Sequence, residues 1–231
     1  QNTWLGYAWS VANPLAFALI YFIAFGIFMQ VQVPDYPLFL IAGLFPWHWL
    51  SYSIGAAPHI FLANASLIKK VRFPSNALVA STVLNSGIHF MLSIPVILGF
   101  LLAYHIAPSW SWLIGIPLLV LAQFVMVYGV SLAVASLNLF FRDLDRLVSL
   151  LVTFLFFLTP IAYSSSMIPA QYQAFMYLNP VAPLMLSWQQ LFLSGVLNWT
   201  FIVGGLFYAV VFLVLGSLIY RKLSWKFAEV L

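Results

Sequence analysis

Charged residues are scarce in this sequence. Of its 231 residues, 65% are hydrophobic and only 5% are Asp, Glu, Lys or Arg. Soluble domains carry about 25% charged residues, so this chain has too little charge to cover a water-exposed surface. The shortage excludes a soluble globular domain and a disordered chain, and it predicts a protein that lies in a lipid bilayer.

Cysteine and acidic residues are the other shortages. The chain has no cysteine, which excludes a disulfide framework and thiolate metal sites. Its four acidic residues are Asp35, Asp143, Asp145 and Glu229, and all of them fall outside the hydrophobic runs. Carriers driven by protons or ions usually place carboxylates within the membrane. We therefore expect the energy for any transport to come from another source. Eight basic residues are too few for a nucleic-acid-binding surface.

Long hydrophobic runs are abundant. A helix needs about 20 apolar residues to cross a bilayer, and the runs do not alternate as the strands of a membrane barrel would. We predict an all-α integral membrane fold that forms one transmembrane domain over residues 1–231. The expected six spans are 14–33, 38–58, 78–104, 113–137, 147–163 and 199–220.

The basic residues predict the topology. Loops on the cytoplasmic side are enriched in Lys and Arg, and six spans with both termini in the cytoplasm place every basic residue on that side. These residues are Lys69, Lys70 and Arg72 in the second loop, Arg142 and Arg146 in the fourth, and Arg221, Lys222 and Lys226 in the tail.

The segment 164–198 contains two shorter apolar pieces, 170–178 and 181–197, which meet near Asn179 and Pro180. A further full crossing here would move the basic tail to the outer side. We therefore predict two short helices that enter the outer leaflet and return.

The third expected span is unusually polar. Asn85 has donors and an acceptor that its own helix cannot easily satisfy, so this helix should face protein or a hydrated path. Because His89 lies near Ser86 and Ser93, an intramembrane enzyme that uses His89 as a base is an alternative. His48, His59 and His105 are expected near the ends of spans. Small residues at 129 and 133 allow another helix to approach the fourth span closely.

Several short motifs occur in an order typical of one family. They are Leu5-Gly6-Tyr7-Ala8-Trp9 with Asn13-Pro14, Gly43-Leu44-Phe45-Pro46-Trp47, Asn64-Ala65 through Ile68-Lys69-Lys70 to Phe73-Pro74, Asn138-Leu139-Phe140-Phe141-Arg142-Asp143, and Thr159-Pro160-Ile161 with Asn179-Pro180. On these motifs the sequence resembles the membrane subunit of polysaccharide-exporting ABC transporters, the type-two permeases, and among them the O-antigen exporters of Gram-negative bacteria.

The resemblance implies a multi-pass protein of the bacterial inner membrane that forms a homodimer above two copies of a separate ATPase subunit. ATP and Mg would be bound by that ATPase, so no cofactor or metal is expected in this chain, and no catalytic residue. The family also has a basic amphipathic helix before the first span, most of which we expect to precede this sequence. The segment 64–73 corresponds to a coupling helix that rests on the ATPase, and 164–198 to a periplasmic gate.

The same reading assigns roles to individual residues. Aromatic side chains on and before the first two spans are candidates to line a path for a lipid-linked glycan, with membrane lipids around the bundle. The candidates are Tyr7, Trp9, Tyr21, Phe22, Phe25, Trp47 and Trp49 for the path, Asn64, Lys69, Lys70, Arg72 and Phe73 for the ATPase contact, and Arg142, Asp143 and Arg146 for a second cytoplasmic loop. The alternative cargoes for a permease of this class are teichoic acid, capsule or a drug.

Overall fold

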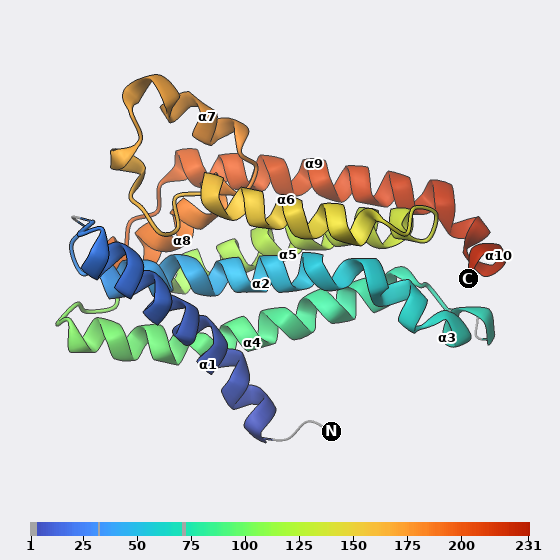
Figure 1. The fold of residues 1–231 in the computed structure, drawn as a ribbon, viewed down its shortest axis with the longest axis horizontal. Coiled ribbons are helices and arrows are strands. Elements are labelled where there is room, and N and C mark those ends of the chain that lie inside the picture. The colour runs from blue at the N-terminus through green and yellow to red at the C-terminus, as the bar shows by residue number, and fades with distance from the viewer. Residues whose placement is uncertain (1–3, 32, 71–72) are drawn as a thin grey trace.

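The structure is a computed structural model that describes residues 4–31, 33–70 and 73–231, with side chains from residue 12 onward except at 174, 177 and 228. These residues form helices and connecting loops, and they contain no β-strand. Figure 1 shows most of the long helices lying along one direction, with the N-terminal helix oblique to them. The α-helices are α1 (Trp4–Tyr21), α2 (Tyr36–Ala63), α3 (Ala65–Lys70), α4 (Asn76–Ala103), α5 (Trp112–Asn138), α6 (Leu144–Leu158), α7 (Gln173–Leu178), α8 (Ala182–Ser194), α9 (Trp199–Leu223) and α10 (Phe227–Val230).

Three helical segments are long and apolar enough to cross a membrane, namely Asn76–Ala103, Trp112–Asn138 and Trp199–Lys226. A shorter apolar helix covers Ala12–Phe28. The chain is therefore a multi-pass membrane protein. With 28 residues, α2 is about 42 Å long at 1.5 Å per residue. That length also exceeds the hydrocarbon core of about 30 Å.

The first predicted span, 14–33, does not coincide with the helix in the structure. The helix already includes Trp4, and it continues from α1 through a stretch of π-helix, Phe22–Phe28. Pro14 lies inside α1, although proline is best tolerated in the first turn of a helix. Because the run of apolar residues extends past Phe28, hydropathy could not show where the helix stops.

The fifth predicted span, 147–163, extends beyond α6, which ends at Leu158. Thr159 has extended backbone angles (φ −95°, ψ 132°), as expected for a residue that precedes proline. Pro160 cannot donate a backbone hydrogen bond to continue the helix. Residues 159–162 are nevertheless buried, so the chain turns inward there instead of leaving the bundle.

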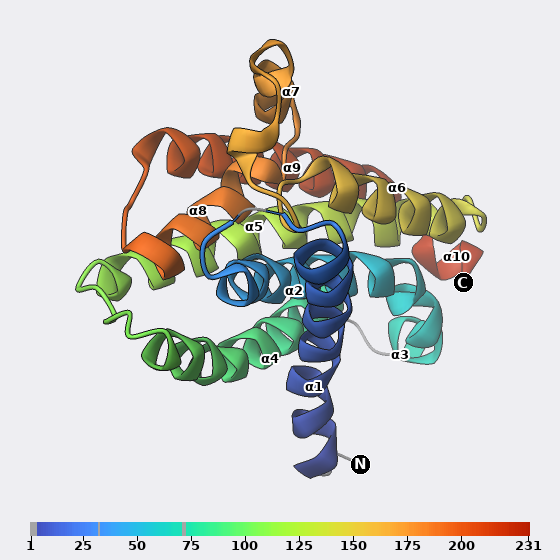
Figure 2. The same cartoon turned by 60° about the vertical axis from the view of Figure 1, so that its left-hand side comes forward.

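The segment 164–198 contains two 3-10 turns, Ser165–Met167 and Ala170–Tyr172, and then α7 and α8. The two helices meet at residues 179–181, as predicted. They differ in burial, because Phe175 and Leu178 on α7 are exposed whereas most of α8 is buried. In Figure 2, α7 projects from one side of the bundle and α1 from the other, while α8 lies among the long helices.

Buried amides fasten α2 to its neighbours. Gln123 on α5 donates from Nε2 to the carbonyl oxygen of Pro46 (2.8 Å), and its Oε1 accepts from Nε1 of Trp188 on α8 (2.7 Å). Fifteen residues along α5, Asn138 Nδ2 donates to the carbonyl oxygen of Pro58 (2.8 Å). Gln123 and Trp188 are fully buried, so Gln123 joins α2, α5 and α8 within the bundle.

Replacing Gln123 with leucine should lower the stability of the folded protein by about 1–2 kcal/mol, because each hydrogen bond between membrane helices contributes about 0.6–1.7 kcal/mol and Trp188 loses its acceptor. The measurement is thermal unfolding of the purified protein in detergent. Gln190→Leu is the control, since Gln190 Oε1 has no hydrogen-bond partner among the described residues. Equal losses for the two variants would contradict this role for Gln123.

Helices α5 and α9 approach each other closely at two glycines. A Cβ atom on Gly216 would lie 2.0 Å from the carbonyl oxygen of Gly129, and a Cβ atom on Gly129 would lie 2.5 Å from the backbone nitrogen of Leu213. Both neighbours are backbone atoms, so neither can move aside easily. The small residue at 129 therefore allows the close approach that its spacing predicts, and Gly216 is its partner.

Candidate functional site

The basic residues of the described chain gather at one end of the bundle. Figure 1 shows α3, the start of α6 and the C-terminal α10 at the same end. The basic residues on these elements and their connecting loops are exposed. They are Lys69, Lys70, Arg142, Arg146, Arg221, Lys222 and Lys226. The predicted residue Arg72 lies outside the described residues. Positive charge concentrated at one end favours contact with an acidic protein surface or with anionic lipid.

A single asparagine connects α2 to the short helix α3. Asn64 caps the end of α2, where its Nδ2 donates to the carbonyl oxygen of Ile60 (2.8 Å). Its own carbonyl oxygen accepts from the backbone nitrogens of Leu67 and Ile68, both at 3.0 Å, and so begins α3. Among the other predicted contact residues, Lys69 and Lys70 are exposed and Phe73 is half-buried. A push on α3 would therefore act directly on the end of α2.

An aromatic cluster lies at the same end. Phe61 near the end of α2 contacts Phe227 and Tyr220, with ring centroids 5.0 and 6.5 Å apart. The Tyr220 hydroxyl group is 2.9 Å from Ser75 Oγ, next to the start of α4. The cluster therefore joins α2, α4, α9 and the C-terminal tail beside the base of α3.

The loop between α5 and α6 places Asp143 at the N-terminal cap of α6. Its side chain makes no capping hydrogen bond. Asp145 in the first turn accepts from the backbone nitrogen of Arg146 at 2.7 Å. Arg142, Asp143 and Arg146 are exposed, so this loop is available for contacts beyond the chain.

The aromatic residues predicted to line a path are divided between two environments. Tyr21, Phe22 and Phe25 are half-buried, and the Tyr21 ring lies 5.3 Å from Phe156 on α6. Trp47 is buried and also packs on Phe156, at 5.4 Å. Tyr7 and Trp9 fall in α1, but their side chains lie outside the described part of the structure.

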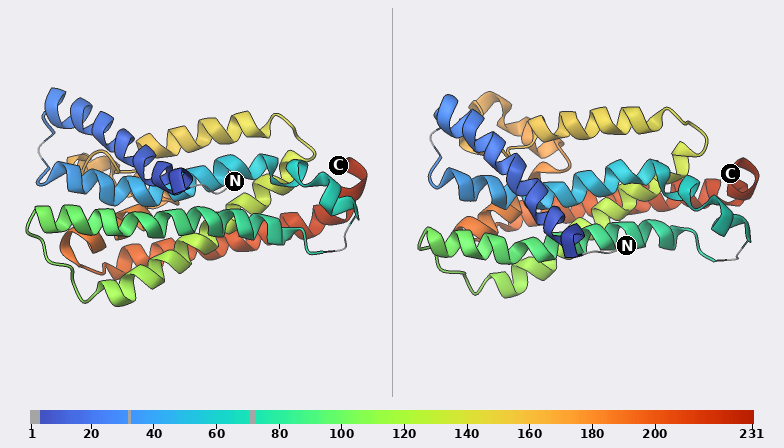
Figure 3. Two further views of the ribbon diagram at one scale, coloured as in Figure 1. Left: turned by 90° about the horizontal axis from the view of Figure 1, so that it is seen from below. Right: turned by 60° about the horizontal axis from the view of Figure 1, so that its bottom comes forward.

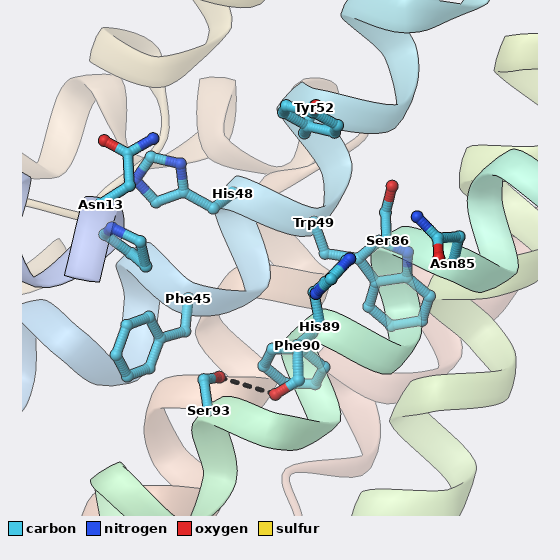
Figure 4. Close-up of a pocket in the computed structure, with 11 residues that line it drawn as sticks. Asn13, Phe45, His48, Trp49, Tyr52, Asn85, Ser86, His89, Phe90 and Ser93 are labelled. Atoms are coloured by element: carbon cyan, nitrogen blue, oxygen red, sulfur yellow. Dashed lines mark hydrogen bonds between the residues drawn. The ribbon is translucent and has the colours of Figure 1, made fainter. Parts of the chain in front are cut away.

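Trp49 instead borders a cavity of about 310 Å³ between α1, α2 and α4. Its Nε1 donates to the carbonyl oxygen of Val83 (3.1 Å), and its ring is stacked on Phe90 at 5.5 Å. Figure 4 shows imidazole, amide, hydroxyl and aromatic groups around the cavity. The lining residues are Asn13, Pro14, Phe45, His48, Trp49, Tyr52, Asn85, Ser86, His89, Phe90 and Ser93.

The sequence indicated one wall of this cavity, the polar face of α4, but not the walls on α1 and α2. The polarity of Asn85, Ser86, His89 and Ser93 indicated that α4 faces protein or a hydrated path, and the structure places them against α1 and α2. His48 was expected near a span end, but it lies near the middle of α2. Asn13 was noted only as part of a family motif, and Tyr52 was not singled out, because neither position indicates which other helix it meets. Figure 3 shows α1 crossing α2 and α4 obliquely, which is how Asn13 reaches the cavity.

Comparison with known proteins decides between the transporter and enzyme interpretations. Residues 1–193 match the family described as "ABC-2 type transporter". The chain belongs to the ABC-2 type transporter family. It is therefore a transporter component and not an intramembrane enzyme.

The chain is similar to permease proteins of O-antigen export systems and to a polysialic acid transport protein. It is 46% identical over 231 residues, all of this chain and 89% of the relative, to an O-antigen export system permease protein of Klebsiella pneumoniae. Identity is 34% over 194 residues (83% of this chain, 74% of the relative) with the protein of the same name in Myxococcus xanthus. A polysialic acid transport protein of Escherichia coli is 25% identical over 190 residues (77% of this chain, 69% of the relative).

Proposed function

We propose that this chain is the permease subunit of an exporter that moves a lipid-linked polysaccharide, an O-antigen, across the bacterial inner membrane. The observation that carries the proposal is the 46% identity over the whole chain with an O-antigen export permease. The scarcity of acidic residues supports it, because the six predicted spans contain no carboxylate with which to couple transport to an ion gradient.

The working complex in this proposal has two copies of the chain and two ATPase subunits that bind ATP and Mg. Six segments cross the membrane, both termini lie in the cytoplasm, and the basic end of the bundle faces the ATPase. The positive-inside rule supports this orientation. The segment 164–198 would act as the outer gate. Its helix α8 is held from inside the bundle by Gln123, so movement of α2 or α5 would reach it.

ATP binding would drive the cycle through α3. Closure of the ATPase dimer pushes α3, and Asn64 transfers the push to α2 because its side chain and carbonyl group join the two helices. The aromatic cluster of Phe61, Tyr220 and Phe227 transmits the movement of α2 to α4 and α9. The two permease copies then separate and open a path along their interface.

Export and complex formation test the proposal together. Deleting the gene should remove the polysaccharide from the cell surface and leave it inside the cell, and the wild-type chain should restore it. A candidate ATPase from the same cells should co-purify with the chain, and the polysaccharide should stimulate its activity in proteoliposomes. A chain that binds no ATPase, or export that continues without ATP under a proton gradient, would contradict the proposal.

Reversing the charge of α3 should weaken the ATPase contact. In the double variant Lys69→Glu/Lys70→Glu, ATPase affinity and export should each fall at least about tenfold, because two exposed interface charges together contribute about 1.4 kcal/mol or more. The variant Lys69→Arg/Lys70→Arg keeps the charge and should behave like wild type. The measurements are ATPase binding at two salt concentrations and surface polysaccharide, normalised to chain in the membrane. Equal binding by both variants would show that α3 is not the contact.

A capsule polysaccharide is the second candidate cargo, because the chain is also similar to a polysialic acid transport protein. The two candidates differ in what accumulates inside the deletion strain. Sugar analysis of the retained polymer distinguishes them.

A further inference from the structure

The cavity between α1, α2 and α4 lies at mid-depth in the bundle. His48 is the 13th of the 28 residues of α2, and His89 is the 14th of the 28 residues of α4. At 1.5 Å per residue, each lies about 20 Å from both ends of its helix. A polar cavity at this depth is surrounded by the hydrocarbon region of the bilayer, where polar groups occur mainly with a functional role.

The cavity has a polar rim and a more buried floor. Asn13, Tyr52 and Asn85 at the rim are exposed on the surface of the chain. Ser86 and Ser93 on the floor are buried, and their hydroxyl groups already donate to carbonyl oxygens of α4 at 3.1 and 2.6 Å. Exposed amide groups cannot face acyl chains without losing their hydrogen bonds. The rim therefore needs water or a polar ligand.

The chemistry of the lining selects the class of ligand. The lining residues include no Lys, Arg, Asp or Glu, so the cavity has no permanently charged side chain to compensate the charge of a phosphate group or an acidic sugar. Neutral amide, imidazole and hydroxyl groups can exchange hydrogen bonds with sugar hydroxyls. The rings of Phe45, Trp49 and Phe90 line the cavity, and the negative electrostatic potential of an aromatic face attracts the C–H edges of a sugar ring. A volume of about 310 Å³ is at the lower end for ligand pockets, about 300–1,000 Å³.

We infer that the cavity lined by Asn13, His48, Trp49, Asn85 and His89 is a hydrated site that binds one uncharged sugar unit of the polysaccharide. This inference rests on the proposed export function and adds a site for it. Because the rim is open, the neighbouring sugars can continue along the surface of α1 and α4 while one unit occupies the cavity. Neutral contacts without an ion pair hold a sugar weakly enough for the polymer to move on.

The absence of cysteine allows a clean test with single-cysteine variants. Asn85→Cys places a thiol at the rim. Val210→Cys is the control, because Val210 is exposed on the middle of α9 and does not line the cavity. Both are treated with a charged, water-soluble maleimide in membrane fragments open on both sides. The fragments come from cells that synthesise the exported polysaccharide and from the same cells with its synthesis blocked.

Without polysaccharide, Asn85→Cys should react at least tenfold faster than Val210→Cys, because only the rim is reached by water. With polysaccharide, labelling of Asn85→Cys should slow at least threefold and that of Val210→Cys should not change.

In a separate export experiment, Asn85→Leu should reduce export at least fivefold. Ser81→Ala, which removes an exposed α4 hydroxyl group that does not line the cavity, should leave export unchanged. Amounts of each variant in the membrane are measured by immunoblot.

Slow labelling of Asn85→Cys, or labelling that polysaccharide does not slow, would overturn the sugar site while wild-type export remained intact. A protection that appears only when both chain copies are cross-linked would assign the rim to a second copy and would also overturn it. Absence of export by the wild-type chain would instead reject the proposed function, and the sugar site with it.

Discussion

Replacing Gly216 with alanine is expected to destabilise the protein by at least about 3 kcal/mol, at the upper end of the cost of overpacking a core. The added Cβ atom would lie 2.0 Å from the carbonyl oxygen of Gly129, so α5 and α9 must move apart. Because both contacting groups belong to helix backbones, a rotamer change cannot relieve the clash. In a thermal unfolding experiment on the purified protein, the midpoint should fall by about 10 °C.

Gly99→Ala is the matched control. Gly99 also lies within a long helix, α4, but its Cβ atom would meet nothing within 4 Å. Alanine forms helix better than glycine by about 1 kcal/mol, so this variant should be as stable as wild type or slightly more stable. If the two alanine variants unfold at the same temperature, the α5–α9 contact is not the tight crossing that the structure describes.

Replacing Phe227 with alanine should release the C-terminal tail from the bundle. Phe227 is only 2% exposed and packs on Phe61 and Tyr220, and truncation of a buried phenylalanine costs about 3–5 kcal/mol. A loss of about 3 kcal/mol raises the detached fraction about 100-fold. Trypsin should then cleave after Lys222 and Lys226 about 100-fold faster, as measured by mass spectrometry of timed samples.

Trp225→Ala removes an even larger aromatic ring two residues earlier in the same tail. Trp225 is 67% exposed, so this control should change the free energy of docking by less than about 0.5 kcal/mol. Similar cleavage rates in the two variants would mean that aromatic burial at 227 does not hold the tail. If the aromatic cluster also carries force from α3, Phe227→Ala should lower export more than it lowers ATP hydrolysis.

The buried amide of Gln123 and the exposed amide of Asn85 have different roles in the bundle. Gln123 has both ends of its amide group occupied, by Pro46 and Trp188, and is fully buried. Gln123 therefore has a structural role, because it joins α2, α5 and α8. Asn85 is exposed at a cavity rim, so its hydrogen-bonding groups are available to a ligand. Residue type alone does not separate these roles, since both are amides in apolar helices.

The amino-acid sequence by itself determined the class of the protein. Five per cent charge and 65% hydrophobic residues leave no stable alternative to a membrane-embedded helical fold, because lipid cannot satisfy exposed backbone groups. The order of its proline, asparagine and basic motifs indicated the family, which residues 1–193 then matched. The resemblance also predicted a helix within residues 64–73, and the structure has α3 there, joined to α2 by Asn64. The contact of this helix with an ATPase stays a prediction.

Only the tertiary structure decided which polar residues meet. Asn13, His48 and Asn85 are far apart in the chain and share one cavity because α1 crosses α2 and α4 at an angle. Hydropathy cannot predict this, since it does not show which residues of neighbouring helices meet, and a helix crossing angle depends on how side chains interlock between neighbours. The same holds for Gly216, whose role exists only because Gly129 of another helix lies against it.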